Sequence, residues 1–335
     1  MKAVEIQRFG LEGLRLVDRP EPDPGPGQIL LRMQAASLNA RDLMTARGQY
    51  NPKQSLPLIP CSDGVGRVEA IGEGVTRVRE GDRVTPIFAQ QWISGEPTLD
   101  LRHSTLGGPR DGTLAEWMVI DQEGAVVPPA HLTDEECAAL PCAAVTAWSA
   151  LVTHGEVRED DVVLVQGTGG VSIFALQFAT MLGARVIVTS SSDEKLARAR
   201  ELGAWETINY NANPDWGKQA RKLTGGNGVD LIVEVGGART LTQSLAAIRF
   251  AGRICLIGVL SGVAAEVNVI PVLMQQVRIQ GLFVGHREGF EAMNRAIETH
   301  TTRPVVDRVF PLDQTRAAME CLAGGEHFGK ICIRI

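Results

Sequence analysis

The chain has 335 residues, of which 44% are hydrophobic and 21% charged, and its formal net charge at pH 7 is −6. This length favours two domains over one. Lys and Arg are scattered rather than striped, which argues against nucleic acid and anionic membranes as main partners. No apolar stretch is long enough to span a bilayer.

The cysteines and the first residues of the chain indicate the cellular compartment in which the protein is expected. The six Cys residues lack paired spacing, so we expect reduced thiols. Residues 1–6 alternate like a strand and lack the apolar core of a signal peptide. Together these features favour a cytoplasmic protein.

The first part of the chain, residues 1–128, is predicted to be rich in β-structure. Short apolar runs bounded by glycine turns predict a small barrel. The expected strands are 1–6, 14–17, 29–36, 65–71, 83–85 and 114–120. One or two helical turns are expected at 41–47, with Asn39 as a possible cap. The long loop at 89–112 is either a substrate lid or a simple insertion, and both interpretations stay open.

From residue 129 the pattern changes to alternating helices and strands. Helices are predicted at 134–140 and 143–152, separated by Pro141. The predicted strands are 162–165, 185–189, 207–210, 229–235, 254–257 and 277–284. Alternating strands and helices form right-handed crossovers, so this part is an α/β domain with a doubly wound parallel sheet.

The central motif is the stretch Val162 to Ser172, in which a valine-rich strand runs into a glycine-rich turn and a helix start. Gly167 allows a sharp turn, and Gly169 removes a Cβ where a pyrophosphate must approach. The helix N-terminus offers unpaired N–H groups and a positive dipole end to that anion. We therefore predict a dinucleotide site formed by Gly167, Thr168, Gly169, Gly170 and Val171. The alternative is a plain turn without a ligand.

Ligands in such a sheet bind at the carboxyl ends of the strands. The other cofactor-binding residues predicted there are Ser190, Ser191, Lys195, Tyr210, Gly236, Ile257, Val259, Phe283 and Val284. An NAD site usually carries an acidic residue after the second strand, and this chain has Ser190 there. A serine leaves room for a 2′-phosphate, so the predicted cofactor is NADPH (NADP). Lys195 can reach that phosphate, or it is only a solvated helix charge.

The last part of the chain returns to the first domain. Phe290, Met293 and Ile297 have helical spacing and are expected to form a core face. Asp313 is expected to cap a helix through Leu322, and residues 331–333 to form a last strand. We infer that this segment packs on the N-terminal domain, with the dinucleotide domain inserted between.

Several motifs along the chain carry a family resemblance. They are Ser37–Asp42, Pro60–Gly66, Gly72–Thr76, Gly81–Val84, Leu140–Ala143 and the glycine loop. With these motifs the chain resembles the medium-chain dehydrogenase/reductase superfamily, in its zinc-independent, quinone oxidoreductase-like branch, over essentially its whole length. The resemblance implies a GroES-like β-barrel catalytic domain (1–128 and 286–335), a Rossmann domain (129–285) and a cleft between them.

Zinc-dependent members of that superfamily have a cysteine where this chain has Asn39 and a histidine where it has Ser62. They also carry a four-cysteine lobe, and the matching stretch between Pro86 and Gly112 has no cysteine. Because zinc needs thiolate or imidazole ligands, we expect no metal. Cys61 is a possible substitute ligand or, more simply, a small buried residue in a turn.

The resemblance also suggests catalytic residues. Asn39 matches an asparagine near the nicotinamide and could donate to the accepting oxygen. Thr146 resembles the threonine that lies against the nicotinamide ring. Asp42 is either catalytic, a helix cap or a partner of Arg41 or Arg47.

Two cationic residues and a tyrosine complete the predicted site. Arg287 and Lys330 match positions near the cleft, and we count Lys330 among the cofactor-binding residues; a solvated surface charge is the alternative for both. In NADPH-using quinone reductases of this branch a lysine and a tyrosine stand at the spacing of Lys195 and Tyr210.

The predicted function is zinc-independent, NADPH-dependent transfer of hydride to a quinone or an α,β-unsaturated carbonyl, with a small molecule as acceptor. One alternative is an alcohol dehydrogenase acting on an alcohol/aldehyde pair. Another is a non-catalytic NADPH-binding protein, as the resemblance to lens crystallins of the superfamily allows. A homodimer or a dimer of dimers through the Rossmann domain is expected, because closed symmetry is the default for soluble oligomers.

Overall fold

The computed structural model describes residues 1–335 and divides into two compact units. Unit 1 comprises Met1–Val145 and Gly285–Ile335, and unit 2 comprises Thr146–Val284. The first boundary therefore falls later than the predicted 128/129, because α2 (Asp134–Ala138) packs on strands of unit 1. The second boundary falls one residue earlier than predicted.

Unit 1 is built on β-sheets. The strands β1 (Lys2–Ile6) and β2 (Leu14–Asp18) form an antiparallel pair. A seven-stranded sheet has the order β14-β15-β3-β4-β5-β7, with β6 also beside β3. Its strands are β3 (Gln28–Ser37), β4 (Asp63–Ile71), β5 (Arg83–Pro86), β6 (Trp117–Asp121), β7 (Ala125–Val126), β14 (Val306–Pro311) and β15 (Lys330–Arg334). The β-rich character predicted for this part is confirmed.

The long strand β3 organises unit 1. Its inward residues Ile29, Leu31 and Met33 are buried in one core cluster with side chains of β4, β5 and β6. At its carboxyl end β3 pairs with β15, where Ser37 lies opposite Cys332. The C-terminal segment thus belongs to unit 1, as predicted, because its alternating apolar residues complete this sheet.

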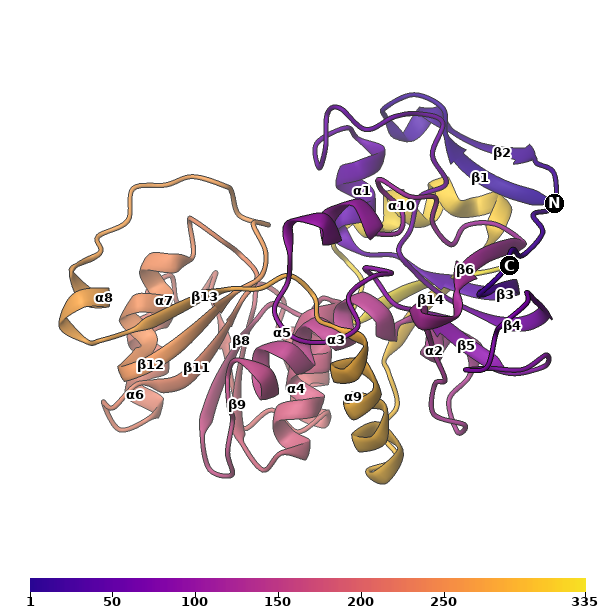
Figure 1. Ribbon diagram of the computed structural model, residues 1–335. Coiled ribbons are helices and arrows are strands. Elements are labelled where there is room, and N and C mark those ends of the chain that lie inside the picture. Colours follow the sequence, from indigo (N-terminus) through magenta and orange to yellow (C-terminus); the bar gives the residue numbers. More distant parts are fainter. The chain divides into compact units, whose positions relative to one another are not determined.

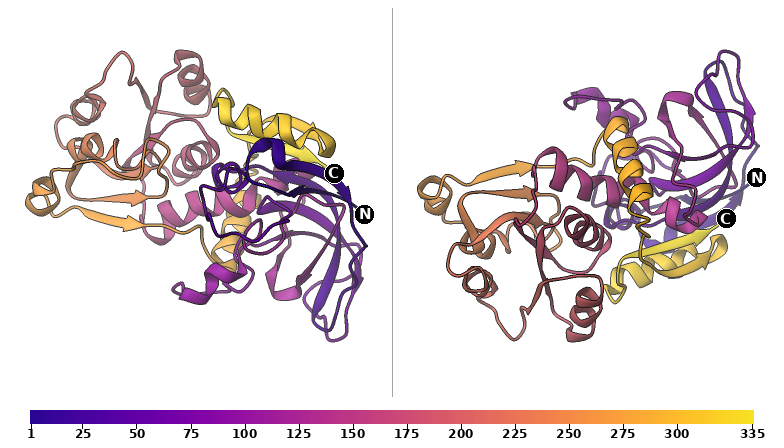
Figure 2. Two further views of the ribbon diagram at one scale, coloured as in Figure 1. Left: turned by 90° about the horizontal axis from the view of Figure 1, so that it is seen from above. Right: turned by 90° about the horizontal axis from the view of Figure 1, so that it is seen from below.

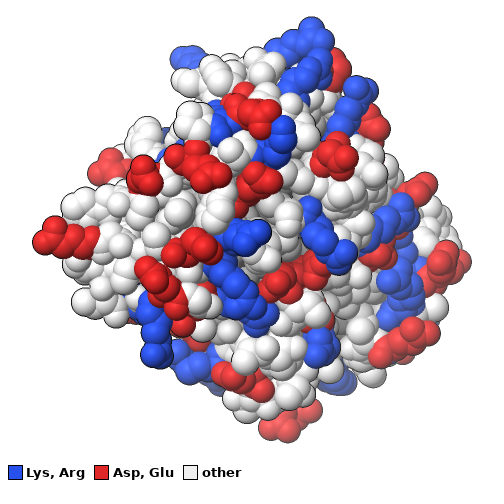
Figure 3. Space-filling model, turned by 90° about the vertical axis from the view of Figure 1, so that its right-hand side faces the viewer, with Lys and Arg blue, Asp and Glu red and all other residues white.

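Four α-helices accompany these sheets: α1 (Ala40–Ala46), α2, α9 (Arg287–Thr299) and α10 (Thr315–Gly324). Phe290, Met293 and Ile297 of α9 are buried, which confirms the predicted core face. The prediction that Asp313 caps the next helix is wrong, since Gln314 is the N-cap of α10 and Asp313 lies in a preceding 3-10 turn. On the face shown in Figure 3, acidic and basic side chains are interspersed.

The predicted helix break at Pro141 is also wrong. Helical structure continues from α2 through a π-helical turn (Leu140–Ala144), α3 (Val145–Trp148) and a second π-helical turn (Ser149–Thr153). Pro141 lies in the first turn of the wider segment, where a missing N–H removes little hydrogen bonding. None of the helices is both long and apolar enough to cross a membrane.

Unit 2 is a doubly wound parallel sheet, as predicted. Its six strands have the order β10-β9-β8-β11-β12-β13, and every pair is parallel. The strands are β8 (Val162–Gln166), β9 (Arg185–Ser190), β10 (Glu206–Asn209), β11 (Val229–Glu234), β12 (Ile248–Leu256) and β13 (Arg278–Gly281). The strand order reverses between β8 and β11, which is where such sheets bind their ligands.

Helices cover both faces of this sheet, with α4 and α5 on one face and α6 and α7 on the other (Figures 1 and 2). The helices are α4 (Gly170–Met181), α5 (Asp193–Glu201), α6 (Trp216–Leu223), α7 (Leu241–Ala247) and the short α8 (Ile270–Met274). All five residues of β8 are buried, as expected for a strand covered on both sides.

Candidate active site

A buried polar cluster lies where β3 ends in unit 1. Asn39 follows β3, Asp63 begins β4 and Lys330 begins β15. Because β4 and β15 both pair with the end of β3 at Ser37, these side chains converge from distant parts of the sequence. The pairing of strands therefore builds this cluster.

Lys330 is the centre of the cluster and is only 2% exposed. Its Nζ donates to the Leu38 carbonyl at 2.7 Å and to Asn39 Oδ1 at 2.5 Å, and it lies 3.9 Å from Asp63 Oδ2. An ammonium can only donate, so it fixes which atom of the Asn39 amide faces it. Asn39 Nδ2 is left buried without a hydrogen-bond partner. For Lys330 the surface-charge alternative is wrong.

Asp42 is fully buried in the first turn of α1. One carboxylate oxygen accepts from the Asn39 N–H at 2.8 Å, and the other lies 3.6 Å from Nη1 of Arg41. Burial raises the pKa of Asp42 to about 6, although the Arg41 guanidinium opposes the shift. Asp42 therefore performs both structural roles foreseen for it, as helix cap and as partner of Arg41.

Arg41 joins α1 to the long loop of unit 1. Its guanidinium lies over the rings of Tyr50 and Phe88, at 4.9 and 4.8 Å from their centroids. It donates to the carbonyls of Leu106 and Gly108 at 2.7 and 3.1 Å. The loop predicted at 89–112 is thereby anchored at its second half, and it contains a 3-10 segment at Leu99–Ser104.

Asp63 is the site residue that sequence reasoning missed, although it lies within a family motif. It is fully buried, and its carboxylate accepts from the Ser62 hydroxyl at 2.8 Å and from the Cys142 N–H at 3.2 Å. Burial raises the pKa of Asp63, and the Lys330 ammonium opposes that shift. Two carboxylates thus face two cations, Arg41 and Lys330, in a water-poor site.

Cys61 lies beside this cluster in a tight turn. It is buried and has a φ of 75°, and its Sγ lies 3.2 Å from the Ser37 carbonyl. Burial raises the pKa of the Cys61 thiol, which favours the protonated form. The simpler prediction, a small buried residue in a turn, is confirmed.

Arg287 pairs within unit 1. Its guanidinium forms an ion pair with Glu123 and lies 3.7 Å from Glu291, and its side chain is only 12% exposed. The solvated-charge interpretation of Arg287 is therefore wrong.

In unit 2 the glycine loop has the geometry predicted for it. Gly167 has a φ of 71°, and its N–H donates to the Thr189 carbonyl at 2.7 Å. No atom lies within 4 Å of the place where a Cβ would be at Gly167 or Gly169. No side chain caps α4, so the N–H groups of its first turn have no partner within the helix. The open space and the free donors fit an approaching phosphate group.

The parallel sheet brings the other predicted residues to the same edge of unit 2. Ser190 ends β9 and its carbonyl accepts from the Tyr210 N–H at 3.1 Å. Ser192 caps α5 and accepts from the Lys195 N–H at 3.3 Å. The remaining positions at strand ends are Ser191, Gly236, Ile257, Val259, Phe283 and Val284.

Three predicted residues have surroundings that the sequence did not reveal. Both backbone groups of Gly236 are used inside unit 2, since its N–H donates to Glu234 and its carbonyl accepts from Ser261. Thr146 is 3% exposed and is the first residue of unit 2. Lys330, predicted to bind cofactor, belongs to unit 1 and contacts Asn39.

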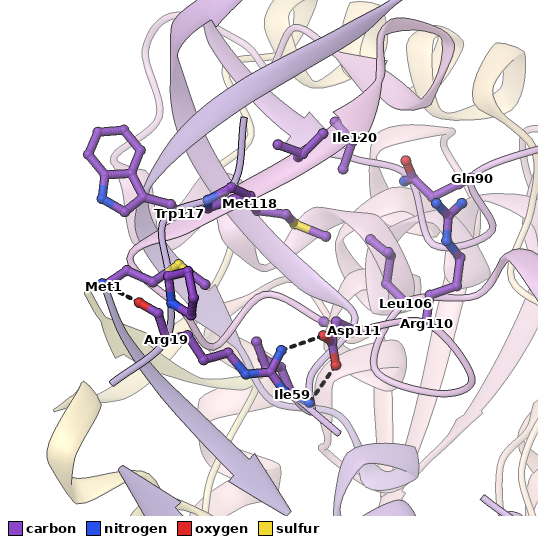
Figure 4. Close-up of a pocket in the computed structure, with 14 residues that line it drawn as sticks. Met1, Arg19, Ile59, Gln90, Leu106, Arg110, Asp111, Trp117, Met118 and Ile120 are labelled. Carbon is purple, nitrogen blue, oxygen red and sulfur yellow. Dashed lines mark hydrogen bonds and ion pairs between the residues drawn. The ribbon is translucent and has the colours of Figure 1, made fainter. Parts of the chain in front are cut away.

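A separate hollow of about 520 Å³ in unit 1 contains none of the predicted site residues. Figure 4 shows Asp111 between Arg19 and Ile59, and its carboxylate accepts from Arg19 at 2.7 Å and from the Ile59 N–H at 2.9 Å. Apolar side chains, among them Met118 and Ile120, form another part of its lining. Because none of the predicted site residues lines this hollow, it is separate from the candidate active site.

Unit 2 has a parallel sheet with a glycine loop at its switch point, and unit 1 bears a buried polar cluster. This combination defines a class of two-domain nucleotide-dependent oxidoreductases. Residues 25–130 match the family model of the alcohol dehydrogenase GroES-like domain, and residues 170–299 match that of the zinc-binding dehydrogenases. The chain belongs to the medium-chain dehydrogenase/reductase superfamily and is an oxidoreductase.

Curated relatives span the whole chain. A zinc-type alcohol dehydrogenase-like protein of Schizosaccharomyces pombe is 44% identical over 316 residues, which are 92% of this chain and 91% of the relative. The quinone oxidoreductase of Sus scrofa is 29% identical, over 96% of this chain and 93% of the relative. The chain is thus similar to proteins named for two different reactions.

Solved structures of other proteins are also similar to the whole chain. A Sinorhizobium meliloti 1021 structure described as an alcohol dehydrogenase has a TM-score of 0.93 and 40% identity, over 100% of this chain and 98% of that one. A mycobacterial protein complexed with NADPH has a TM-score of 0.84 and 28% identity, over 100% of both chains.

Proposed function

We propose that the chain is an NADPH-dependent reductase that transfers hydride, without zinc, to a quinone or an α,β-unsaturated carbonyl. The observation that carries the proposal is the Asn39 amide, whose oxygen is held by Lys330 and whose Nδ2 has no partner. An oriented N–H donor suits an acceptor oxygen that becomes negative when hydride arrives. When bound, the nicotinamide supplies that hydride.

In this proposal the residues around Asn39 act through it. Lys330 and the Asp42 carboxylate fix the side chain and the backbone N–H of Asn39, respectively. An amide fixed on both sides needs no reorganisation as charge develops on the substrate oxygen. The paired carboxylates and cations keep the buried cluster close to neutral, and the Asp63 carboxylate near the Asn39 amide is itself offset by the Lys330 ammonium.

The residues at the family's metal position do not fit zinc. A tetrahedral zinc site needs thiolate, imidazole or carboxylate ligands, whereas Asn39 offers an amide and Ser62 a hydroxyl that donates to Asp63. A cation also already contacts Asn39, namely the Lys330 ammonium. Across residues 1–335 there is no group of three or more His, Cys, Asp or Glu side chains that could hold a metal.

We therefore expect the dialysed protein to contain no stoichiometric zinc. The physical reason is that the two family ligand positions hold an amide and a hydroxyl, and that the neighbouring Asp63 carboxylate is already engaged by Ser62 and Lys330. Elemental analysis after extensive dialysis should find well below one zinc per chain. About one tightly held zinc per chain would overturn this expectation.

We also expect a homodimer or a dimer of dimers through unit 2. Several apolar side chains there are exposed: Val259, Leu260, Val263, Val269, Ile270, Leu273, Met274 and Ile279. The edge strand β13 is exposed along its whole length. Exposed apolar side chains and an uncovered strand edge favour association. Light scattering at micromolar concentration should give at least twice the monomer mass, and a monomeric mass would contradict it.

The main alternative is an alcohol dehydrogenase, which the names of the relatives from Schizosaccharomyces pombe and Sinorhizobium meliloti favour. A panel of quinones, enals, saturated ketones and alcohols separates the two reactions. The proposal predicts NADPH oxidation with quinones or enals and little turnover of saturated alcohols with NADP. Efficient alcohol oxidation would favour the alternative, and cofactor binding without turnover of any acceptor would favour a non-catalytic protein.

A further inference from the structure

A buried carboxylate lies at the carboxyl end of β11, at the centre of unit 2. Glu234 is fully buried and accepts five hydrogen bonds. One oxygen accepts from the N–H groups of Gly236 and Gly237, both at 2.9 Å, and from the Thr240 hydroxyl at 2.6 Å. The other accepts from Gln166 Nε2 at 2.6 Å and from the Ser244 hydroxyl at 2.5 Å.

All five donors to Glu234 are uncharged. Buried carboxylates usually have a cationic partner, because burial of a charge is costly. Here hydrogen bonds alone satisfy the Glu234 carboxylate. They connect it to the end of β8, to the loop after β11 and to the start of α7. A group with this many partners determines where those partners lie.

Gln166 carries this constraint to the glycine loop. It is the last residue of β8, immediately before Gly167. Its Nε2 donates to Glu234 and its Oε1 accepts from the Gly236 N–H at 3.1 Å. Its own carbonyl accepts from the Ser172 hydroxyl of α4 at 2.7 Å. The two strands at the switch point are thus tied together at their carboxyl ends.

The loop after β12 is tied to the same network. The Glu234 carbonyl accepts from the Ile257 N–H at 2.8 Å. The Gly236 carbonyl accepts from the Ser261 N–H at 2.7 Å and from the Ser261 hydroxyl at 2.8 Å. Three loops at the ligand-binding edge of the sheet therefore form one hydrogen-bonded unit.

The two glycine-rich loops of unit 2 differ in where their N–H groups point. Those of Gly236 and Gly237 turn inward to Glu234, whereas the first turn of α4 has no capping side chain. Of these two loops, the one after β8 is therefore the one whose N–H groups remain available to a phosphate. Glu234 engages the N–H groups of Gly236 and Gly237, and through Gln166 it fixes the position of the loop after β8.

We infer that Glu234, acting through Gln166, is a positioning residue for the cofactor loop at residues 167–171. The inference rests on the proposed function, because it presumes that this loop binds NADPH. It predicts that the Gln166–Glu234 pair sets the affinity for the cofactor and not only the stability of unit 2.

The test is direct titration of NADPH by fluorescence, with thermal unfolding measured in parallel. Glu234→Gln keeps the shape but turns an amide N–H toward the Gln166 and Ser244 donors, so the Kd for NADPH should rise about tenfold. The matched control is Asp230→Asn at the other end of β11, where the acid accepts from the Val162 N–H and from Arg249. Its Kd should stay within about twofold of wild type, whatever its Tm.

A swap variant, Gln166→Glu with Glu234→Gln, restores one carboxylate and one amide facing each other. It should recover most of the lost affinity, because each lost donor–acceptor pair is re-formed in reverse. If Glu234→Gln does not fold, Ser244→Ala, which removes one of the five donors, should weaken binding about threefold.

The outcomes separate the inference from the proposed function. Failure of the wild type to bind NADPH would contradict the proposed function. If the wild type binds and Glu234→Gln lowers the Tm but leaves the Kd unchanged, Glu234 is only structural and the inference is overturned. A swap variant that folds but does not recover affinity would also overturn it.

Discussion

Asn39→Ala is expected to lower kcat by about a hundredfold to a thousandfold, because removal of one donor to a developing oxyanion costs roughly this much. The Kd for NADPH should change little, because the phosphate groups are expected to bind the glycine loop and Asn39 is expected to act on the acceptor oxygen. Asn39 is also the N-cap of α1 and forms a capping box with Asp42, as predicted, so a loss of about 1 kcal/mol of stability is expected and the Tm is measured alongside. Steady-state kinetics with the best acceptor and a cofactor titration provide the two readouts.

Two companion variants sharpen this result. Asn51→Ala removes an exposed asparagine of the same unit and should leave kcat unchanged. Lys330→Met removes the ammonium that orients the Asn39 amide, so it should lower kcat while a cavity is largely avoided. Unchanged turnover in Asn39→Ala would remove this residue from the mechanism.

NADPH is expected to be preferred over NADH by about tenfold to a hundredfold in kcat/KM, since a charge-assisted contact to the 2′-phosphate is worth this much. Ser190, which ends β9, places no carboxylate where that phosphate would lie. The next acid, Asp193, is engaged by Asn209 Nδ2 at 2.7 Å. Lys195→Ala should lower kcat/KM for NADPH about tenfold and leave that for NADH nearly unchanged.

A surface lysine of the same unit provides the control for this prediction. Lys218 on α6 pairs with Asp215 at the surface, and Lys218→Ala should affect neither cofactor. Raising the salt concentration should weaken NADPH binding more than NADH binding, because the additional contact is ionic. NADH used as well as NADPH, or a Lys195→Ala variant that weakens both equally, would mean that the 2′-phosphate is not recognised here.

Local patterns were sufficient to predict most elements of the fold. The strands predicted at 29–36, 162–165 and 185–189 are present as β3, β8 and β9. Continuous apolar runs in β8 and β9 match the full burial expected for strands that are covered on both faces. Glycine and proline signals were less reliable. Pro141 does not end the helical segment, because π-helical turns accommodate it.

The candidate site was only partly predictable, for a physical reason. Asn39 could be proposed from a motif, but the contact with Lys330 spans 291 residues and depends on strand pairing. A lysine at the start of a short strand gives no local sign that it will be buried. Glu234 did offer a sign, since an acid ends an otherwise apolar central strand. Its five partners come from loops whose paths the sequence does not specify.

The most direct test of the account is the rate of NADPH oxidation by enzyme from which metal has been removed with a chelator, with a quinone or an enal as acceptor. The account predicts the same rate as before treatment, because the donor at the acceptor oxygen is the Asn39 amide and not a metal. Loss of activity on chelation, restored by added zinc and accompanied by oxidation of a saturated alcohol, would contradict it.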